Sequence, residues 1–186
     1  MFNSLDWDPT QYRPLLHLQV RLLRPDARFD RRFDSSDLVQ ETLLKAHKNR
    51  DQFSGTTEAE RVRWLQRILR NVLIDAIREA TAPKRDVRLE ASLQNALARS
   101  SECLEEYLSD RGPSPSQQVE LQELLLRLAA ALEELPPDQC DVVIQRDLEG
   151  ESVKDIAARL GRSEKAVAGL LLRGRRRLAE ILKNYQ

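Results

Sequence analysis

The sequence predicts an all-α protein built from two small helical domains. Apolar residues recur at helical spacing along most of the 186 residues, and no stretch shows the alternation typical of a half-buried strand. The run GPSPS at 112–116 interrupts this pattern and indicates a linker. We therefore expect a first domain over 1–85, an acidic linker over 86–115 and a second domain over 116–186.

Three helices are expected in the first half, over about 9–25, 34–50 and 58–81. The first carries a leucine-rich stripe, and a proline closes it. The second begins at the DSS cluster of 34–36, whose short polar side chains can cap exposed amides. A proline lies just beyond the third helix, so its end is also marked.

The second half predicts a leucine-rich helix over 117–135, which ends at two consecutive prolines. A helix over 138–148, a short one over 153–160 and an arginine-rich one over 163–182 follow. The last two have the spacing of a helix-turn-helix, with a plain helical hairpin as the alternative.

The turn of this helix-turn-helix rests on four residues. Ser152 and Asp155 predict a capping box whose side chains bond first-turn amides reciprocally. Gly161 stands where the turn needs a positive φ, and Ser163 can cap the next helix. The residues expected to close the small core are Ala157, where a second helix crosses closely, with Ile156, Leu160, Val167 and Leu170.

Sorted at 100° per residue, the last helix has an inward apolar face and an outward polar one. Gly169 on the outward face costs about 1 kcal/mol of helix stability, which is easier to understand if a backbone or a phosphate must come close. Arginines that only solvate the helix end are the alternative. The candidate DNA-binding residues are Ser163, Lys165, Gly169, Leu172, Arg173 and Arg176, with Arg175 and Arg177 on the flanks, where phosphates would lie.

The helix over 58–81 predicts a second nucleic-acid face. Its outward row is rich in guanidinium groups, which bind phosphates and base edges, and no carboxylate lies near its centre. Trp64 on the shoulder can stack on an unpaired base or pack inside the domain, and packing is the more ordinary role. The candidate residues are Arg63, Trp64, Arg67, Arg70, Asn71 and Arg78.

The helix over 34–50 has an exposed leucine among polar residues, which is typical of a docking patch but also occurs on ordinary surfaces. The outward residues of this helix are Asp37, Gln40, Glu41, Leu44 and Lys48.

Composition narrows the function further. The net charge is zero, but 1–85 carries +4 (16 basic, 12 acidic), 86–135 carries −6 (4 and 10) and 136–186 carries +2 (10 and 8). Two basic ends suit a protein that touches a polyanion twice. With no bilayer-length apolar run and no signal-peptide layout, we expect a cytoplasmic chain without membrane insertion.

No enzyme chemistry is predicted. The two histidines are isolated, no nucleophile stands beside a base, and no glycine loop could cradle a phosphate. Cys103 and Cys140 are far apart and without a neighbouring histidine, so we expect no catalytic residues, no metal site and no cofactor.

The motifs DLVQETLLKAH, WLQRILRNVLIDAIR and LPPDQCDVVIQRDLEGESVKDIAARLGRSEKAV resemble the sigma-70 family. The short layout is similar to extracytoplasmic-function (ECF) sigma factors, with region 2 over about 10–82 and region 4 over 116–182. The resemblance implies a transcription initiation factor that binds core RNA polymerase, recognises a two-part promoter and assists DNA melting. Its implied partners are the β′ and β subunits, promoter DNA and, where one exists, an anti-sigma factor.

The resemblance also implies roles for the candidate residues. The outward face of 34–50 would dock on the β′ coiled coil, the arginine row of 58–81, together with Asp75, would contact the −10 element, and 163–178 would read the −35 element. Family members commonly carry polar residues where this chain has Ala168, Gly169 and Leu170. Base readout would then rest on Lys165, Arg173 and Arg176, with Leu172 near a thymine methyl.

Two other functions fit parts of the sequence. A helix-turn-helix regulator would bind an operator without acting as a sigma subunit, but response regulators of this kind carry an alternating strand-helix domain that the helical first half lacks. A helical adaptor or anti-sigma-type protein would use both basic faces to bind protein, and would not support promoter-dependent transcription.

Overall fold

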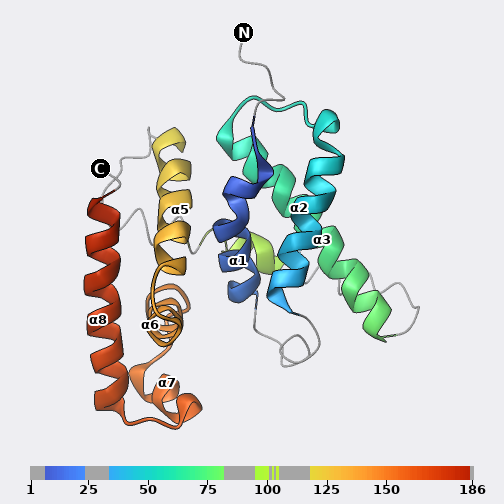
Figure 1. The fold of residues 1–186 in the computed structure, drawn as a ribbon. Coiled ribbons are helices and arrows are strands. Elements are labelled where there is room, and N and C mark those ends of the chain that lie inside the picture. The colour runs from blue at the N-terminus through green and yellow to red at the C-terminus, as the bar shows by residue number, and fades with distance from the viewer. Residues whose placement is uncertain are drawn as a thin grey trace. The chain divides into compact units, whose positions relative to one another are not determined.

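The computed structural model describes residues 7–23, 34–81, 95–100, 102, 104 and 118–184. Its described elements are all helical, and the chain forms two compact units, 1–102 and 103–186 (Figure 1). The predicted linker, 86–115, lies mostly outside the described residues, although 95–100 is helical.

The described residues of the first unit include two 3-10 turns and three principal helices. The turn η1 (Pro9–Tyr12) leads into α1 (Arg13–Leu22), which packs on α2 (Ser35–Lys48), and α2 packs on α3 (Glu58–Thr81). A short 3-10 turn, η2 (Arg50–Gln52), follows α2. The three predicted helices are therefore present. The first differs in its opening turn, because Pro14 near the start of α1 has no amide hydrogen with which to extend the preceding turn as α-helix.

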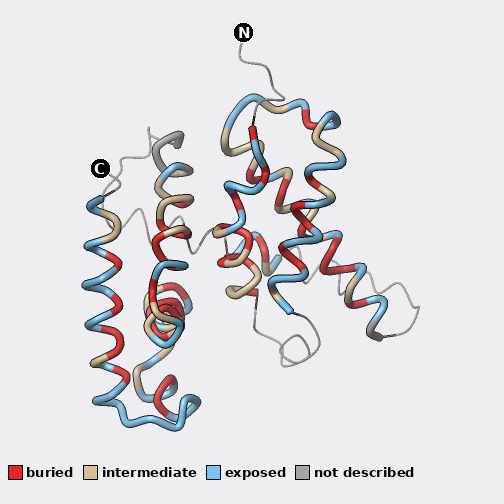
Figure 2. The backbone as a smooth tube through the Cα atoms, in the orientation of Figure 1, coloured by how far each residue is buried: buried red, intermediate tan, exposed pale blue. Residues whose placement is uncertain are grey.

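The core of the first unit consists of the apolar residues on the sides of these helices that face one another (Figure 2). Thr42 is buried there without penalty, because its hydroxyl donates to the Leu38 carbonyl at 2.7 Å. The fully buried side chains of this core include Leu16, Val39, Ala46, Leu65, Leu69 and Leu73.

The second unit begins with α5 (Gln118–Glu133), which packs on the last helix, α8 (Glu164–Lys183). Between them lie α6 (Pro137–Val143), a π-helical turn η3 (Ile144–Leu148) and α7 (Val153–Leu160). The single helix predicted over 138–148 is thus divided, and the Glu149 amide donates to the Ile144 carbonyl, five residues back. Periodicity over so few residues does not distinguish this π-turn from an α-turn.

Candidate functional site

The helix-turn-helix has the predicted turn. Gly161 adopts φ 61° and ends α7, while the Arg162 amide donates to the Ala157 carbonyl at 3.0 Å. Ser163 caps α8 by accepting a bond from the Ala166 amide at 3.2 Å. A hairpin with this left-handed glycine and capped second helix has helix-turn-helix geometry.

Two details of the turn differ from the prediction. Ser152 accepts a bond from the Asp155 amide, but the Asp155 carboxylate accepts the serine hydroxyl at 2.6 Å instead of returning to an amide. Leu160 was expected in the small core and is 38% exposed, because α7 packs on α8 through its middle, where Ile156 and Ala157 are buried.

The outward face of α8 is open to solvent at most of the predicted positions. Leu172 is 72% exposed, the largest value among the exposed large apolar side chains of the described residues. Gly169 is half-buried, and a Cβ there would lie 3.4 Å from the Arg173 guanidinium. The candidates that are exposed on this helix and its cap are Ser163, Lys165, Leu172, Arg173, Arg175, Arg176 and Arg177.

The basic row of α3 also faces outward. Arg63, Arg67, Asn71 and Arg78 are exposed, and Arg70 is half-buried. The helix begins with a complete capping box that was not predicted, although its T-x-x-E pattern at 57–60 is readable in the sequence. The Glu60 carboxylate accepts from the Thr56 and Thr57 amides at 2.8 and 2.9 Å, and the Thr57 hydroxyl accepts from the Glu60 amide. These backbone bonds lower the pKa of Glu60 to about 2.

Trp64, at the shoulder of α3, packs in an aromatic cluster. Its ring centroid lies 5.9 Å from that of Trp7 and 5.5 Å from that of Phe53, and the Trp7 ring also meets the Tyr12 ring edge-on. Burial of the Tyr12 phenol raises its pKa above its usual value. Trp64 therefore packs inside the domain, as considered above. Because the residue is half-buried, only part of its surface could contact a base.

The outward face of α2 carries the candidate docking residues. Asp37, Gln40, Glu41, Leu44 and Lys48 are all exposed, and Leu44 is 52% exposed. Two features hold this helix in place. Asp34 caps its N-terminus by accepting a hydrogen bond from the Ser36 amide at 2.8 Å, and its inward face is buried.

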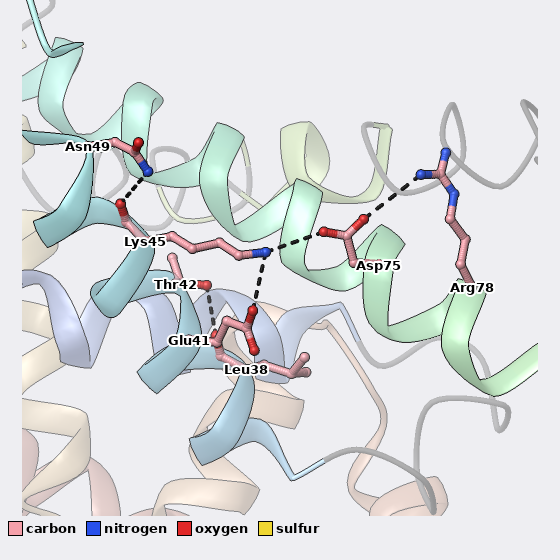
Figure 3. Close-up of polar contacts among 7 residues, drawn as sticks. All are labelled: Leu38, Glu41, Thr42, Lys45, Asn49, Asp75 and Arg78. Carbon is pink, nitrogen blue, oxygen red and sulfur yellow. Dashed lines mark hydrogen bonds and ion pairs between the residues drawn. The ribbon is translucent and has the colours of Figure 1, made fainter.

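An ion-pair chain joins this face of α2 to α3 (Figure 3). The Lys45 ammonium lies 3.2 Å from the Glu41 carboxylate and 3.3 Å from that of Asp75, which lies 3.9 Å from Arg78. Burial opposes the charge of Lys45, but the bonds to Glu41 and Asp75 outweigh it and raise the pKa of Lys45. Lys45 was not a predicted site residue. Its i, i+4 spacing from Glu41 is visible in the sequence, but the contact with Asp75 depends on how the helices pack.

Arg175, predicted on the phosphate-facing flank of α8, forms an ion pair within the chain. Its Nε lies 3.0 Å from Asp147 Oδ2, and a second nitrogen binds the other carboxylate oxygen. Arg176, in contrast, pairs with Glu180 one turn along the same helix at 3.1 Å.

Two features are absent from the described residues. In this part of the chain no helix combines the length and the apolar character needed to cross a membrane. Nor do three or more His, Cys, Asp or Glu side chains within it gather as metal ligands.

Comparison with known proteins matches two family regions. Sigma-70 region 2 matches residues 10–82, and sigma-70 region 4 matches 125–178. Among curated relatives, the ECF RNA polymerase sigma factor SigF of Caulobacter vibrioides is 32% identical over 98% of this chain and 92% of its own length. SigE of Mycolicibacterium smegmatis is 29% identical over 82% of this chain, which spans about half (53%) of that relative.

Among solved structures, a similar chain is in a co-crystal of the sigma factor RpoE with the anti-sigma factor NepR from Bartonella quintana. It shows 26% identity, covers 92% of this chain and 91% of its own, and has a TM-score of 0.35.

Proposed function

The chain belongs to the ECF group of the sigma-70 family, and from this premise we propose that it binds core RNA polymerase and directs it to promoters with −10 and −35 elements. In this proposal it assists melting of the DNA and acts by binding alone, without catalytic residues or a cofactor. It works in the cytoplasm, and its partners are the β′ and β subunits, promoter DNA and an anti-sigma factor where the cell has one.

The observation that carries the proposal is the presence of two outward basic helices in one chain, each within a matched sigma region. The row on α3 lies in the region 2 match, and the candidate residues of α8 lie in the region 4 match. Guanidinium groups of this kind bind phosphates and guanine edges. A regulator that binds only an operator is not favoured, because it would leave the region 2 match and the exposed face of α2 without a role.

We assign three surfaces within this function. The polymerase-docking face is the outward side of α2, where Leu44 supplies an apolar contact among polar ones. The −10 face is the basic row of α3, beside which the half-buried Trp64 contacts DNA. The −35 face is the outward side of α8, where Lys165, Arg173 and Arg176 are the proposed base readers.

Reconstitution with bacterial core polymerase tests the function directly. The holoenzyme should initiate at defined positions in a genomic fragment library, and core alone should not. A library in which the complete chain never produces a promoter-specific start would overturn the proposal.

The double variant Arg67→Ala/Arg70→Ala tests the −10 face. We expect initiation to fall by at least about tenfold, because each arginine contact to DNA is worth roughly 1–3 kcal/mol. Core binding, measured by fluorescence anisotropy, should remain within about twofold, since these residues lie on α3 and not on the docking face of α2.

The matched control is Arg13→Ala/Arg99→Ala, which removes two exposed arginines outside the three surfaces and so changes the net charge equally. It should initiate like the wild type. Loss of core binding in the Arg67/Arg70 variant would reassign the basic row of α3 to polymerase docking.

A further inference from the structure

Arg175 on α8 is held by a carboxylate that is almost completely buried. The Asp147 side chain is 6% exposed and that of Arg175 is 48% exposed. The guanidinium uses two nitrogens on the two oxygens of one carboxylate, which is the bidentate form of this pair. The two residues are 28 positions apart, so the pair joins α8 to η3.

A second contact of a different kind lies beside it. A Cβ on Gly174 would be 2.8 Å from Val143 Cγ2 and 3.3 Å from the Gln139 carbonyl oxygen, so only glycine allows this approach of α8 to α6. Gln139, Val143 and Asp147 follow one another at four-residue spacing and so line one side of α6 and η3. Residues 174 and 175 therefore attach α8 to this side by close packing and by a paired charge.

This attachment controls where the reading residues lie. Lys165 is ten residues from Arg175, a distance of about 15 Å along a helix. A tilt of roughly 10° about the attachment would move Lys165 by roughly 2–3 Å, which exceeds the tolerance of a bidentate base contact. The tilt of α8 thus determines whether its outward side chains meet the base edges.

We propose that Arg175 is a positioning residue for recognition of the −35 element and acts through Asp147, not by binding a phosphate. This inference rests on the proposed function. A guanidinium that already occupies both oxygens of an almost buried carboxylate would leave that carboxylate without this partner if it moved to DNA, which is unfavourable for a charge with little access to water.

The test compares holoenzymes on two templates: a promoter recovered from the fragment library, and the same promoter with its upstream element scrambled. The measured quantity is the ratio of initiation on the intact template to that on the scrambled one. The variants are Asp147→Asn and Arg175→Lys. The first removes the carboxylate charge at a residue that would not itself bind a DNA phosphate. The second keeps the positive charge but loses the planar guanidinium that binds both carboxylate oxygens.

We expect both variants to lower this ratio by about tenfold, and Asp147→Asn/Arg175→Lys to be no worse than either alone, because they interrupt one interaction. The matched control is Glu123→Gln, which removes the partner of Arg127 from an i, i+4 pair on α5, with side chains 62% and 35% exposed. Its ratio should stay within about twofold of the wild type.

Other results would overturn the inference. If Asp147→Asn and Arg175→Lys keep the wild-type ratio while Arg175→Ala lowers both initiation and the salt slope of binding by about 1, Arg175 binds a phosphate. A variant that is only less stable reduces initiation equally on both templates and leaves the ratio unchanged, which would also reject a positioning role. If the wild-type holoenzyme initiates nowhere, the proposed function fails first, and this inference fails with it.

Discussion

Gly174 shows how much one missing side chain matters in this protein. A Cβ there would lie 2.8 Å from Val143 Cγ2, closer than Cβ atoms approach other heavy atoms, and a tight 3.3 Å from the Gln139 carbonyl oxygen, which cannot rotate away. Gly169, five residues earlier on the same helix, would place a Cβ 3.4 Å from a flexible arginine end. The two glycines look alike in the sequence, but only one is required for packing.

Gly174→Ala should therefore destabilise the second unit by about 1–3 kcal/mol, because it overpacks the contact between α6 and α8. Gly169→Ala, the matched control, should stabilise α8 by up to about 1 kcal/mol through helix propensity. Urea denaturation followed by circular dichroism measures both free energies of unfolding. Equal effects of the two substitutions would contradict the close approach at Gly174.

At the scale of elements, the start of α3 depends on one carboxylate. Glu60 receives the amides of Thr56 and Thr57 and the Thr57 hydroxyl, and the amide bonds are the main cause of its lowered pKa. A carboxylate whose pKa falls on folding stabilises the native state above its unfolded pKa. That contribution disappears as the pH falls through the folded value of about 2.

We accordingly expect Glu60→Gln to be less stable than the wild type at neutral pH. The difference in free energy of unfolding should shrink between about pH 4.5 and pH 2, where the wild-type carboxyl takes up its proton. Denaturation midpoints measured across this range test the prediction. Thr57→Ala should show a smaller loss in the same direction, and a difference for Glu60→Gln that is constant with pH would contradict the capping role.

α2 and α3 illustrate a second property of elements: their outward faces are connected. The chain of Glu41, Lys45, Asp75 and Arg78 runs from the proposed docking face to the end of the proposed −10 row. Its members are between 37% and 56% exposed, and pairs of this exposure contribute little individually to stability.

At the scale of the whole molecule, two units each carry one proposed DNA face. Two small faces joined by a chain segment bind cooperatively only when their spacing matches the DNA, and polymerase would set that spacing. The modest positive charge of each end adds an attraction to DNA that does not depend on sequence and weakens with salt.

The isolated chain should thus bind a promoter duplex weakly and with little preference over a scrambled duplex. Addition of core polymerase should increase the preference by at least about a hundredfold, as linked binding does when geometry permits it. Fluorescence anisotropy with labelled duplexes, with and without core, measures the change. Strong specific binding by the free chain would favour an operator-binding regulator instead.

Local patterns in the sequence were sufficient to predict the principal helices, the helix-turn-helix and the exposed faces of this protein. Helical periodicity predicted the principal helices, and the helix-turn-helix was predicted from Gly161, Ser163 and the apolar spacing around them, all within one segment. The outward rows of α2, α3 and α8 were assigned correctly as exposed or half-exposed faces, because side-chain direction on a helix follows from residue number. Their binding roles stay predictions.

Tertiary structure decided which of these side chains already have partners within the chain. Periodicity placed Arg175 on a flank of its helix and assigned no role to Lys45. The partner of Arg175, Asp147, lies 28 positions away in the sequence, and Asp75, a partner of Lys45, lies 30 positions away. It also decided that Trp64 packs on Trp7, that Leu160 is exposed and that Gly174 cannot carry a Cβ. Such contacts join residues that are distant in sequence, so no local pattern encodes them, and only the packing of whole helices brings their atoms together.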